Sequence, residues 1–425
     1  MISNIDYDCD VLIIGAGPAG STAATILAGE KGKKVIVLEK EHFPRYHVGE
    51  SLIPHCYDTL NRVGMVERLN ETGFQVKQSV QFVNPDGELS APFYFSKHTD
   101  HPRAKTWQVD RATFDHMMMD RAREAGAEVR EGIKVLDFLE SDGVVVGVTA
   151  EDDSGERFEV RAKMTMDATG RDALFQRKKK WRKRDPKLNK IAIWTNFKGA
   201  KRDPGIDEGA TTVAYVQGKG WFWNIPLKND IVSSGIVAER DYLYRDGRNL
   251  KEIFDREIKE NKWVEEHLSE GEQFGEYWVT GEYSYRAENC ATDGLLLIGD
   301  AFAFLDPVFS SGVYLALTTG ELGADAVADA LDRDDVRAES FLKYGERVCL
   351  GIEWMRKLVY AFYDDNFSFK DVVMNHEEVR RDLTDCLIGD LIDKDYNELF
   401  DKVKRYADLP EELPHGKTVA GSAMT

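Results

Sequence analysis

Apolar and polar residues follow a regular order at the start of the chain. Residues 10–14, Asp-Val-Leu-Ile-Ile, form an apolar run that predicts a buried strand. A glycine-rich turn follows at residues 15–20, then a helical pattern at residues 21–29 and a second apolar strand at residues 34–39. This order of strand, turn, helix and strand predicts a dinucleotide-binding unit.

The middle of the chain has the pattern of short alternating strands. Residues 144–149 and 231–237 are examples, and the helix-like residues 115–125 and 250–267 interrupt the series. We expect strands from about 75–165 and 190–285 to form an antiparallel sheet that builds the substrate side.

Two later strands end in turns of small residues, at 167–170 and 295–300. We expect both to return the chain to the nucleotide unit. The pattern is helical from residue 313 to about 400, and residues 409–425 predict a loosely ordered tail.

Each glycine of the turn has its own physical role. Gly15 permits the tight turn, Gly17 lets the backbone approach a pyrophosphate, and Gly20 lets helix and strand lie close together. Pro18 and Ala19 open the helix, whose free N–H groups and dipole favour phosphate. Glu39, at the end of the second strand, is placed to accept hydrogen bonds from ribose hydroxyls.

Composition narrows the classes of function. The chain has 425 residues and a net charge of −19, which argues against general nucleic-acid binding. No apolar run approaches the roughly 20 residues that span a bilayer, and no signal peptide is expected before the first strand. The five cysteines are scattered without C-x-x-C spacing, so neither a zinc site nor a disulfide framework is indicated. A reducing cytoplasm fits this pattern best.

One stretch opposes the overall charge. Residues 177–184 contain seven basic side chains in eight positions. They are interpreted as a solvated surface loop, as a docking patch for an acidic partner, or as a nucleic-acid or membrane patch.

Several segments resemble the glutathione-reductase-like flavoproteins and imply FAD. Residues 15–20 with Glu39 match the first FAD fingerprint, and Gly299-Asp300-Ala301 is similar to the second, in which the Asp binds ribityl or ribose oxygens. Arg111 stands where related hydroxylases place an Arg beside the flavin phosphates. Residues 43–51, Phe-Pro-Arg-Tyr-His-Val-Gly-Glu-Ser, look like the loop that lines the isoalloxazine. The implied FAD-binding residues also include Lys40, Arg45, Gly49, Glu50, Ser51, Pro307 and Gly312.

Three further features resemble the flavin-dependent halogenases. Residues 221–226, Trp-Phe-Trp-Asn-Ile-Pro, match the W-x-W-x-I-P signature, in which Trp221 and Trp223 would keep the substrate from the flavin. Residues 304–312 fit F-x-x-P-x-x-S-x-G, and Ser311-Gly312 before a predicted helix is a natural halide site. Lys77 follows Glu50 at the distance of the family's essential lysine. Taken singly, these features would be core aromatics, a flavin loop and a solvated lysine.

The resemblance implies halogenation of an electron-rich aromatic ring, using FADH2, O2 and chloride or bromide. Hypohalous acid would pass the two indoles to Lys77, and burial of its amine would lower its pKa and favour the neutral form. The chain is most similar to the compact branch that acts on pyrroles and phenols, often on a carrier protein, and residues 282–285 share that likeness. A separate flavin reductase would supply FADH2. One departure is that Phe302 and Phe304 flank Asp300, where small or polar residues are common.

Two alternatives remain at this point. One is a flavin-dependent monooxygenase or hydroxylase, or a geranylgeranyl-reductase-like oxidoreductase, that keeps the same motifs. The other is a non-catalytic flavin-binding protein.

The resemblance predicts an α/β fold with an FAD-binding three-layer Rossmann-like domain, an antiparallel-sheet substrate domain and a C-terminal helical region. The expected division is FAD binding by 1–75, 166–188 and 286–330, substrate-side sheet by 76–165 (with an FAD-contacting helix) and 189–285, C-terminal helices in 331–408, and a flexible tail in 409–425.

Overall fold

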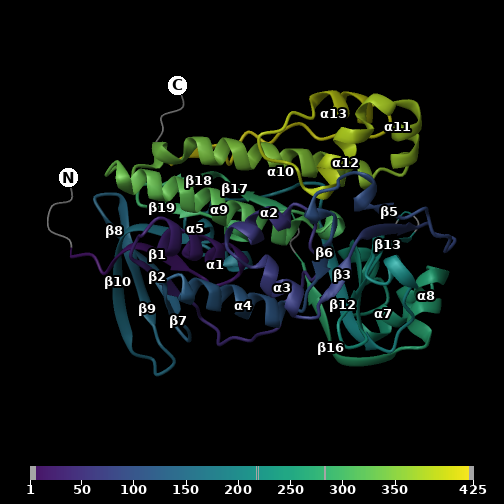
Figure 1. Cartoon of the computed structure of the whole chain (residues 1–425), viewed down its shortest axis with the longest axis horizontal. Coiled ribbons are helices and arrows are strands. Elements are labelled where there is room, and N and C mark those ends of the chain that lie inside the picture. The colour runs from purple at the N-terminus through teal and green to yellow at the C-terminus, as the bar shows by residue number, and fades with distance from the viewer. Residues whose placement is uncertain (1–5, 217, 219, 282–283, 421–425) are drawn as a thin grey trace.

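A nine-stranded sheet and a seven-stranded sheet organise the chain. The computed structural model describes residues 6–216, 218, 220–281 and 284–420. Figure 1 shows the larger sheet towards one end of the long axis and the smaller sheet, with its helices, at the other. The fold is the mixed α/β arrangement that the sequence predicts, with a helical C-terminal region above both sheets.

The centre of the larger sheet is parallel and buried on both faces. β1 (Cys9–Ile14) pairs in parallel with β2 (Val35–Leu38) on one side and β10 (Arg157–Asp167) on the other. β7 (Glu128–Arg130) and β19 (Leu295–Leu297) extend the parallel pairing outward. Continuous apolar runs mark β1 and β2 in the sequence because neither face of these strands meets water.

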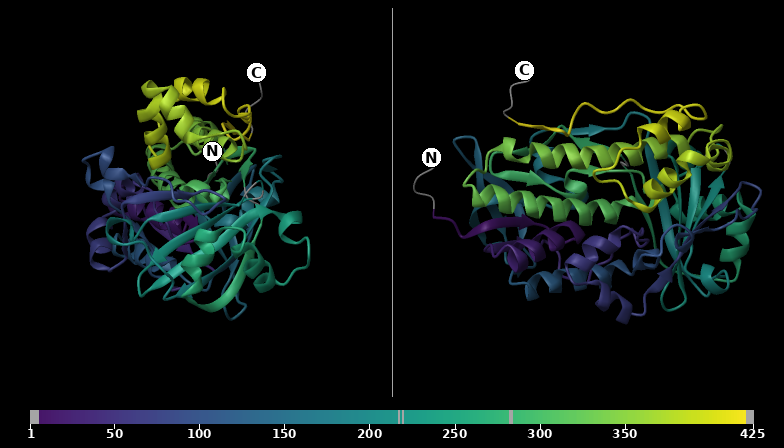
Figure 2. Two further views of the ribbon diagram at one scale, coloured as in Figure 1. Left: turned by 90° about the vertical axis from the view of Figure 1, so that its right-hand side faces the viewer. Right: turned by 45° about the horizontal axis from the view of Figure 1, so that its top comes forward.

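Close helix packing covers this sheet. α1 (Pro18–Thr25) continues into a π-helical turn and lies against the long helix α9 (Ser311–Asp332). A Cβ on Gly320 would lie 2.5 Å from the carbonyl oxygen of Ala19, so only glycine permits this approach. α4 (Arg111–Glu124) lies on α1, and α10 (Leu342–Phe362) runs beside α9, as Figure 2 shows.

One strand assignment from the sequence is wrong. Residues 144–149 were expected in the substrate-side sheet, but β9 (Val144–Glu151) pairs antiparallel with β8 (Lys134–Ser141) and β10 and so extends the larger sheet. The reason is proximity along the chain. The three strands are joined by short turns, and neighbouring strands in sequence pair more readily than distant ones.

The smaller sheet carries the substrate-side strands. Its order is β16-β12-β15-β14-β13-β4-β5, antiparallel except for β13 and β4. Phe222 of β14 faces a second apolar cluster, to which three helices contribute, whereas Trp221 and Trp223 face the main core. The strands are β4 (Ser79–Val83), β5 (Phe93–Tyr94), β12 (Lys190–Lys198), β13 (Thr211–Val216), β14 (Gly220–Leu227), β15 (Ile231–Glu239) and β16 (Glu272–Thr280).

The helix expected over residues 250–267 is two helices. α7 (Leu250–Ile258) ends before Asn261, whose side chain accepts hydrogen bonds from Trp263 and Val264 and caps α8 (Lys262–Ser269). An N-cap asparagine starts a new helix because it satisfies free N–H groups.

The C-terminal segment, predicted to be a flexible tail, contacts the rest of the fold as far as residue 420. β21 (Thr418–Val419) pairs in parallel with β18 (Asn289–Thr292), and Arg286 donates to the carbonyl of Leu413 at 2.9 Å. The segment covers an otherwise unpaired strand edge, which stabilises both partners. Residues 421–425, like Glu282 and Tyr283 of the 282–285 likeness, lie outside the described residues.

The remaining helices and strands are short. They are α2 (Cys56–Arg62), α3 (Val66–Glu71), β3 (Gln75–Lys77), β6 (Thr106–Gln108), α5 (Leu174–Lys178), β11 (Arg182–Arg184), α6 (Arg240–Leu243), β17 (Tyr285–Ala287), β20 (Ala303–Phe304), α11 (Phe369–Asn375), α12 (Arg380–Ile388) and α13 (Asn397–Val403).

All five cysteines are buried and unpaired. Within the described residues, no helix combines the length and apolar character that a bilayer crossing requires.

Candidate active site

The glycine turn after β1 leaves a space bounded by backbone. Gly15 has φ +102°, and a Cβ there would lie 2.5 Å from the carbonyl of Ala168. A Cβ on Gly20 would overlap the carbonyl of Gly15, whereas one on Gly17 would meet only Arg45 Nη2, at 3.8 Å. The turn is therefore closed behind Gly15 and Gly20 and open in front of Gly17, as a bound pyrophosphate requires. Pro18 and Ala19 are buried at the start of α1.

Two carboxylates flank this space. Glu39 Oε2 accepts a hydrogen bond from the backbone N–H of Ala16 at 2.8 Å, which fixes the acid beside the turn. The carboxylate of Asp300 has no hydrogen-bond partner among the described residues, and burial raises its pKa to about 6. A carboxylate without a partner is suited to the hydroxyl groups of a ribityl chain, so the residues present fit FAD. Lys40, by contrast, forms a 2.6 Å ion pair with Asp172.

A buried ion-pair cluster fixes the 43–51 loop. Arg111, the first residue of α4, binds Asp115 through two nitrogens at 2.8 and 2.9 Å and donates to the carbonyls of Val48 and Gly49. Arg45 also binds Asp115, at 3.0 Å. Asp115 thus holds both arginines and the loop in one geometry.

Lys77 is enclosed beside this loop. β3 and β6 pair so that Lys77 lies opposite Thr106, and Ser51 bridges to Gln108 on the other side of β6. Only 1% of Lys77 is exposed, and its Nζ lies 2.8 Å from Ser51 Oγ. Burial lowers the pKa of Lys77 from 10.5 to about 7, which favours the neutral amine far more than in a lysine exposed to water.

A network of hydroxyl and amide groups extends from Ser51, the hydrogen-bond partner of Lys77. Ser51 Oγ lies 2.8 Å from Thr211 Oγ1, and Gln108 Nε2 donates to Thr211 Oγ1 at 2.9 Å and to the carbonyl of Gly209 at 3.0 Å. The lysine is therefore oriented by neutral groups instead of a carboxylate. Because no carboxylate stabilises its positive charge, the uncharged form of the amine is populated near neutral pH.

Trp221 and Trp223 form a wall on one face of β14. Their ring centroids are 6.2 Å apart, and Trp194 of β12 lies 6.2 Å from Trp223. Trp221 Nε1 donates to Tyr363 at 2.9 Å, and Tyr363 donates to Asp306 at 2.8 Å. This chain of hydrogen bonds joins the wall to the 304–312 segment.

The second indole is joined to the 43–51 loop. Trp223 Nε1 donates to Ser233 Oγ at 3.2 Å, and Ser233 is in turn hydrogen-bonded to Glu50. Burial raises the pKa of Glu50 to about 7, and its Oε2 has no partner among the described residues. The sequence analysis did not identify Ser233, Tyr363, Thr211 or Gln108, because no local motif marks them.

The start of α9 presents a site without a side-chain cap. Ser310 precedes the helix with φ +55°, and Ser311 Oγ is buried without a partner among the described residues. Beside Gly312 the space is open, since a Cβ there would meet only Phe304, at 3.9 Å. The first N–H groups of a 22-residue helix attract an anion. Pro307 opens the preceding 3₁₀ turn, and Phe302 is buried against Tyr344 of α10.

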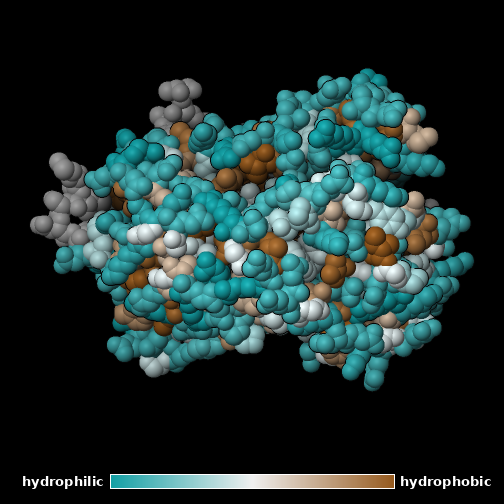
Figure 3. Space-filling model, viewed as in Figure 1, coloured by the Kyte–Doolittle hydropathy of each residue, from teal (hydrophilic) through white to brown (hydrophobic). Residues whose placement is uncertain are grey.

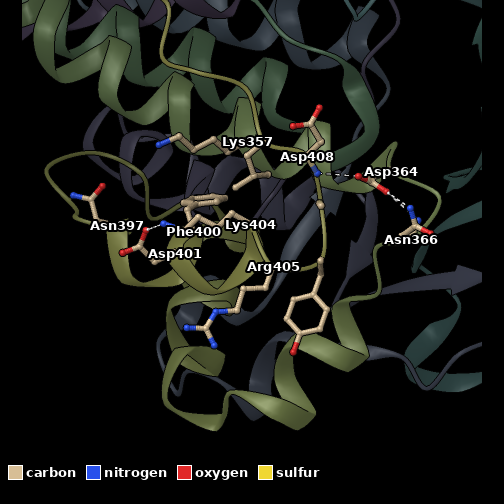
Figure 4. Close-up of a pocket in the computed structure, with 12 residues that line it drawn as sticks. Lys357, Asp364, Asn366, Asn397, Phe400, Asp401, Lys404, Arg405 and Asp408 are labelled. Atoms are coloured by element: carbon tan, nitrogen blue, oxygen red, sulfur yellow. Dashed lines mark hydrogen bonds and ion pairs between the residues drawn. The ribbon is translucent and has the colours of Figure 1, made fainter.

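Two surface grooves lie outside this constellation. One, of about 700 Å³, lies between the end of α10 and α13, and Figure 4 shows its mixed lining of Lys357, Lys404, Asp364 and Asp401. The other, of about 510 Å³, includes Gln75 of β3. None of the predicted catalytic or cofactor-binding residues lines either groove.

Three lysines of the basic segment 177–184 form ion pairs within the chain. Lys178 binds Asp137, Lys179 binds Glu140 at 2.9 Å, and Lys183 binds Glu288 at 3.1 Å. Arg177 and Lys180 remain exposed without an ion pair among the described residues. The segment is thus a weaker docking patch than its sequence suggests.

Along most of its length, the chain is similar to halogenating enzymes. The tryptophan halogenase family model matches residues 10–104 and 96–372. A 1H-pyrrole-2-carbonyl-[peptidyl-carrier protein] chlorinase of Pseudomonas fluorescens is 31% identical, over 96% of this chain and 95% of that protein. A 1H-pyrrole-2-carbonyl-[peptidyl-carrier protein] brominase of Pseudoalteromonas luteoviolacea is 36% identical, over 86% and 90%. The solved structure of the flavin-dependent brominase Bmp2 superposes with a TM-score of 0.85 at 29% identity, covering 94% of this chain and 98% of that one.

Proposed function

This chain belongs to the tryptophan halogenase family of flavin-dependent halogenases, and we propose that it halogenates a pyrrole ring tethered to a peptidyl carrier protein. The enzyme is a flavoprotein that uses FAD and halide. The choice of ring rests on two relatives that are named for the same pyrrole-2-carbonyl carrier substrate and are similar over most of the chain. One observation supports the chemistry most directly, namely the enclosed amine of Lys77 with its lowered pKa.

FAD would be held by the turn at Gly15–Gly20, by Glu39 and Asp300, and by the loop that Arg111 and Arg45 fix. Bound reduced FAD would supply the reaction of O2 with halide that yields hypohalous acid. The start of α9 at Ser311 and Gly312 would hold the halide.

The indole wall then separates two compartments. Trp221 and Trp223 are 2% and 7% exposed and joined by hydrogen bonds to both flanking loops. Such a wall would exclude an aromatic ring from the flavin side while small molecules pass.

Lys77 would deliver the halogen. Its neutral amine holds hypohalous acid through a hydrogen bond, or forms a haloamine with release of water. The electrophilic halogen passes to a ring carbon and the ring proton leaves, so that ring C–H and HOX give C–X and H2O. The haloamine route requires the neutral amine, because an ammonium group has no lone pair with which to bond the halogen.

A substitution that keeps the volume of Lys77 tests this role. Purified enzyme receives FAD, a flavin reductase with NADH, bromide or chloride, and a pyrrole-2-carbonyl-loaded peptidyl carrier protein. We expect the parent to add one or more halogens, detected by the mass of the loaded carrier, and Lys77→Met to abolish the product while FADH2 oxidation continues. Product formation by Lys77→Met at the parental rate would refute the delivery role.

A separate flavin reductase would supply FADH2, because the sequence has one glycine-rich dinucleotide motif. The five unpaired cysteines favour a reducing compartment, namely the cytoplasm.

The proposed FAD-binding parts of the chain are residues 1–75, 166–188 and 286–330. Residues 128–165 belong with them, because the strands from β7 to β10 are part of the larger sheet.

A further inference from the structure

A loop between β5 and β6 covers the catalytic lysine. This segment, residues 95–105, is called here the roof loop. Phe95 at its start is 2% exposed, with its ring centroid 5.7 Å from Lys77 Nζ. Thr106, directly after it, is paired with Lys77 across the β3–β6 ladder. Both ends of the roof loop are therefore anchored at the lysine.

A second, distant segment completes the cover. Ile388, at the end of α12, forms a small buried cluster with Phe95 and Ala104 of the roof loop, and its carbonyl accepts a hydrogen bond from the backbone of His55. The roof loop is thus joined to the end of α12 by a buried apolar cluster of three residues, which is separate from the main core.

The outer side of the roof loop is basic. Lys97, His98, His101 and Lys105 are exposed, and Asp100 is its single acid. Arg103 is engaged by Asp58 at 3.1 Å. In contrast, Lys97 and Lys105 form no ion pair with any described residue.

Neighbouring residues extend this positive surface. Arg380, the first residue of α12, is exposed and close enough to His98 to add to the effect of burial in lowering its pKa. Its neighbour Arg381 faces Asp385 at 3.7 Å. On a chain with a net charge of −19, the exposed Lys97, Lys105 and Arg380, which form no ion pair with any described residue, are a local exception.

We propose that the basic face of the roof loop is the docking surface for the carrier protein, with Lys97 and Lys105 as its principal contacts. This inference rests on the proposed function, since it names the partner of the same site. Carrier domains are small and acidic, so complementary charge would steer them to this face. The overall negative charge of the enzyme disfavours extended polyanions such as nucleic acid. Docking here places the tethered ring at the cover of Lys77, unlike docking at residues 177–184, where Lys178, Lys179 and Lys183 are already paired with carboxylates.

Charge reversal with a matched control tests the surface. Lys97→Glu with Lys105→Glu is compared with Arg177→Glu with Lys180→Glu, since all four side chains are exposed and lack ion pairs among the described residues. Each enzyme receives pyrrole-2-carbonyl-loaded peptidyl carrier protein or, separately, the free N-acetylcysteamine thioester of pyrrole-2-carboxylate.

For the roof-loop pair we expect kcat/KM with the carrier to fall about tenfold, mainly through KM, and to be unchanged with the free thioester. The control pair should behave like the parent with both substrates. Equal losses with both substrates, no loss with the carrier, or the same loss in the control pair would overturn the proposal.

Direct binding separates this proposal from the proposed function. Fluorescence anisotropy of labelled, loaded carrier should show binding to the parent that weakens as salt rises, and weaker binding to the roof-loop pair at low salt. If the parent halogenates neither substrate, the proposed function fails, while this binding difference would still support the docking surface. Equal binding by the parent and the roof-loop pair would overturn it.

Discussion

At the residue scale, Lys77 shows how burial adjusts chemistry. Its amine has an ordinary pKa of 10.5 and here one of about 7. Because the folded value is the lower one, the unfolded chain binds the extra proton between roughly pH 7 and pH 10.5, and this residue makes stability rise with pH over that interval. The same shift favours the neutral amine, the form that the haloamine route proposed for Lys77 uses.

The first prediction follows from this titration. The neutral fraction of an amine with a pKa near 7 rises about tenfold from pH 6 to pH 8. We expect the product formed per FADH2 oxidised to rise by about the same factor, because flavin oxidation itself does not involve Lys77. The measurement is product mass against flavin absorbance across that range, and a flat ratio would contradict the role of the neutral amine.

The second prediction concerns Thr211, which contacts Ser51 and reaches Lys77 only through it. Thr211→Val removes the hydroxyl and keeps the shape. We expect halogenation to slow about three- to tenfold, in line with one hydrogen bond of about 1 kcal/mol. Thr211→Ser should restore the rate, and FAD affinity by fluorescence should stay at the parental value. An equal loss in Thr211→Ser would point to packing instead of positioning.

At the element scale, the start of α9 combines a helix terminus with an unpartnered hydroxyl. The third prediction is that Ser311→Ala raises the KM for halide about three- to tenfold, since one donor to the anion is lost. The KM for the ring should not change. The unfolding midpoint should be unchanged or higher, because the hydroxyl has no partner among the described residues to lose. An unchanged halide KM would argue against Ser311 as a ligand.

Elements with strong local signals were predictable from the sequence. The first strand, the glycine turn and the long C-terminal helices follow from apolar runs and periodicity. The pairing of β9 with β10, and the break at Asn261, were not predictable in this way. Strand partners depend on which segments meet in space, and a single capping side chain outweighs the helical pattern around it.

The candidate site divides in the same manner. Lys77, the two indoles and the 304–312 segment stand in recognisable motifs. Ser233 and Tyr363 do not stand in such motifs, although they join the indole wall to both loops. Ser233 contacts Trp223 from the neighbouring strand β15, and Tyr363 contacts Trp221 from 142 residues away in the chain. Sequence spacing carries no information about such contacts until the fold brings them together.

At the scale of the whole molecule, a buried ionic network joins the C-terminal helix α10 to β17 and to Asp185, which follows its partner strand β11. Glu353 of α10 binds Arg286 of β17 at 2.9 Å and Arg356 at 2.9 Å, and Arg356 binds Asp185 at 2.7 Å. All four side chains are almost fully buried, so each charge depends on its partners.

The fourth prediction is that Glu353→Ala lowers the free energy of unfolding by about 3–5 kcal/mol, since it leaves buried guanidinium groups short of one carboxylate. Asp393→Asn removes the charge of an exposed partner of Arg347 on the same helix and suits the positive φ of this position, so it should cost less than about 1 kcal/mol. Urea unfolding measures both. Similar costs for the two variants would show that the network does not stabilise the fold.

The five buried cysteines have a consequence for an enzyme that makes its own oxidant. Burial raises the pKa of every one of these thiols, to about 12 for Cys9 and Cys56 and about 11 for Cys349. Thiolate is the form that hypohalous acid attacks fastest, and hardly any is present. Met374, 73% exposed on α11, offers its sulfur to stray oxidant instead. Oxidation of the enzyme by its own hypohalous acid would therefore begin at the thioether of Met374 and leave the buried thiols intact.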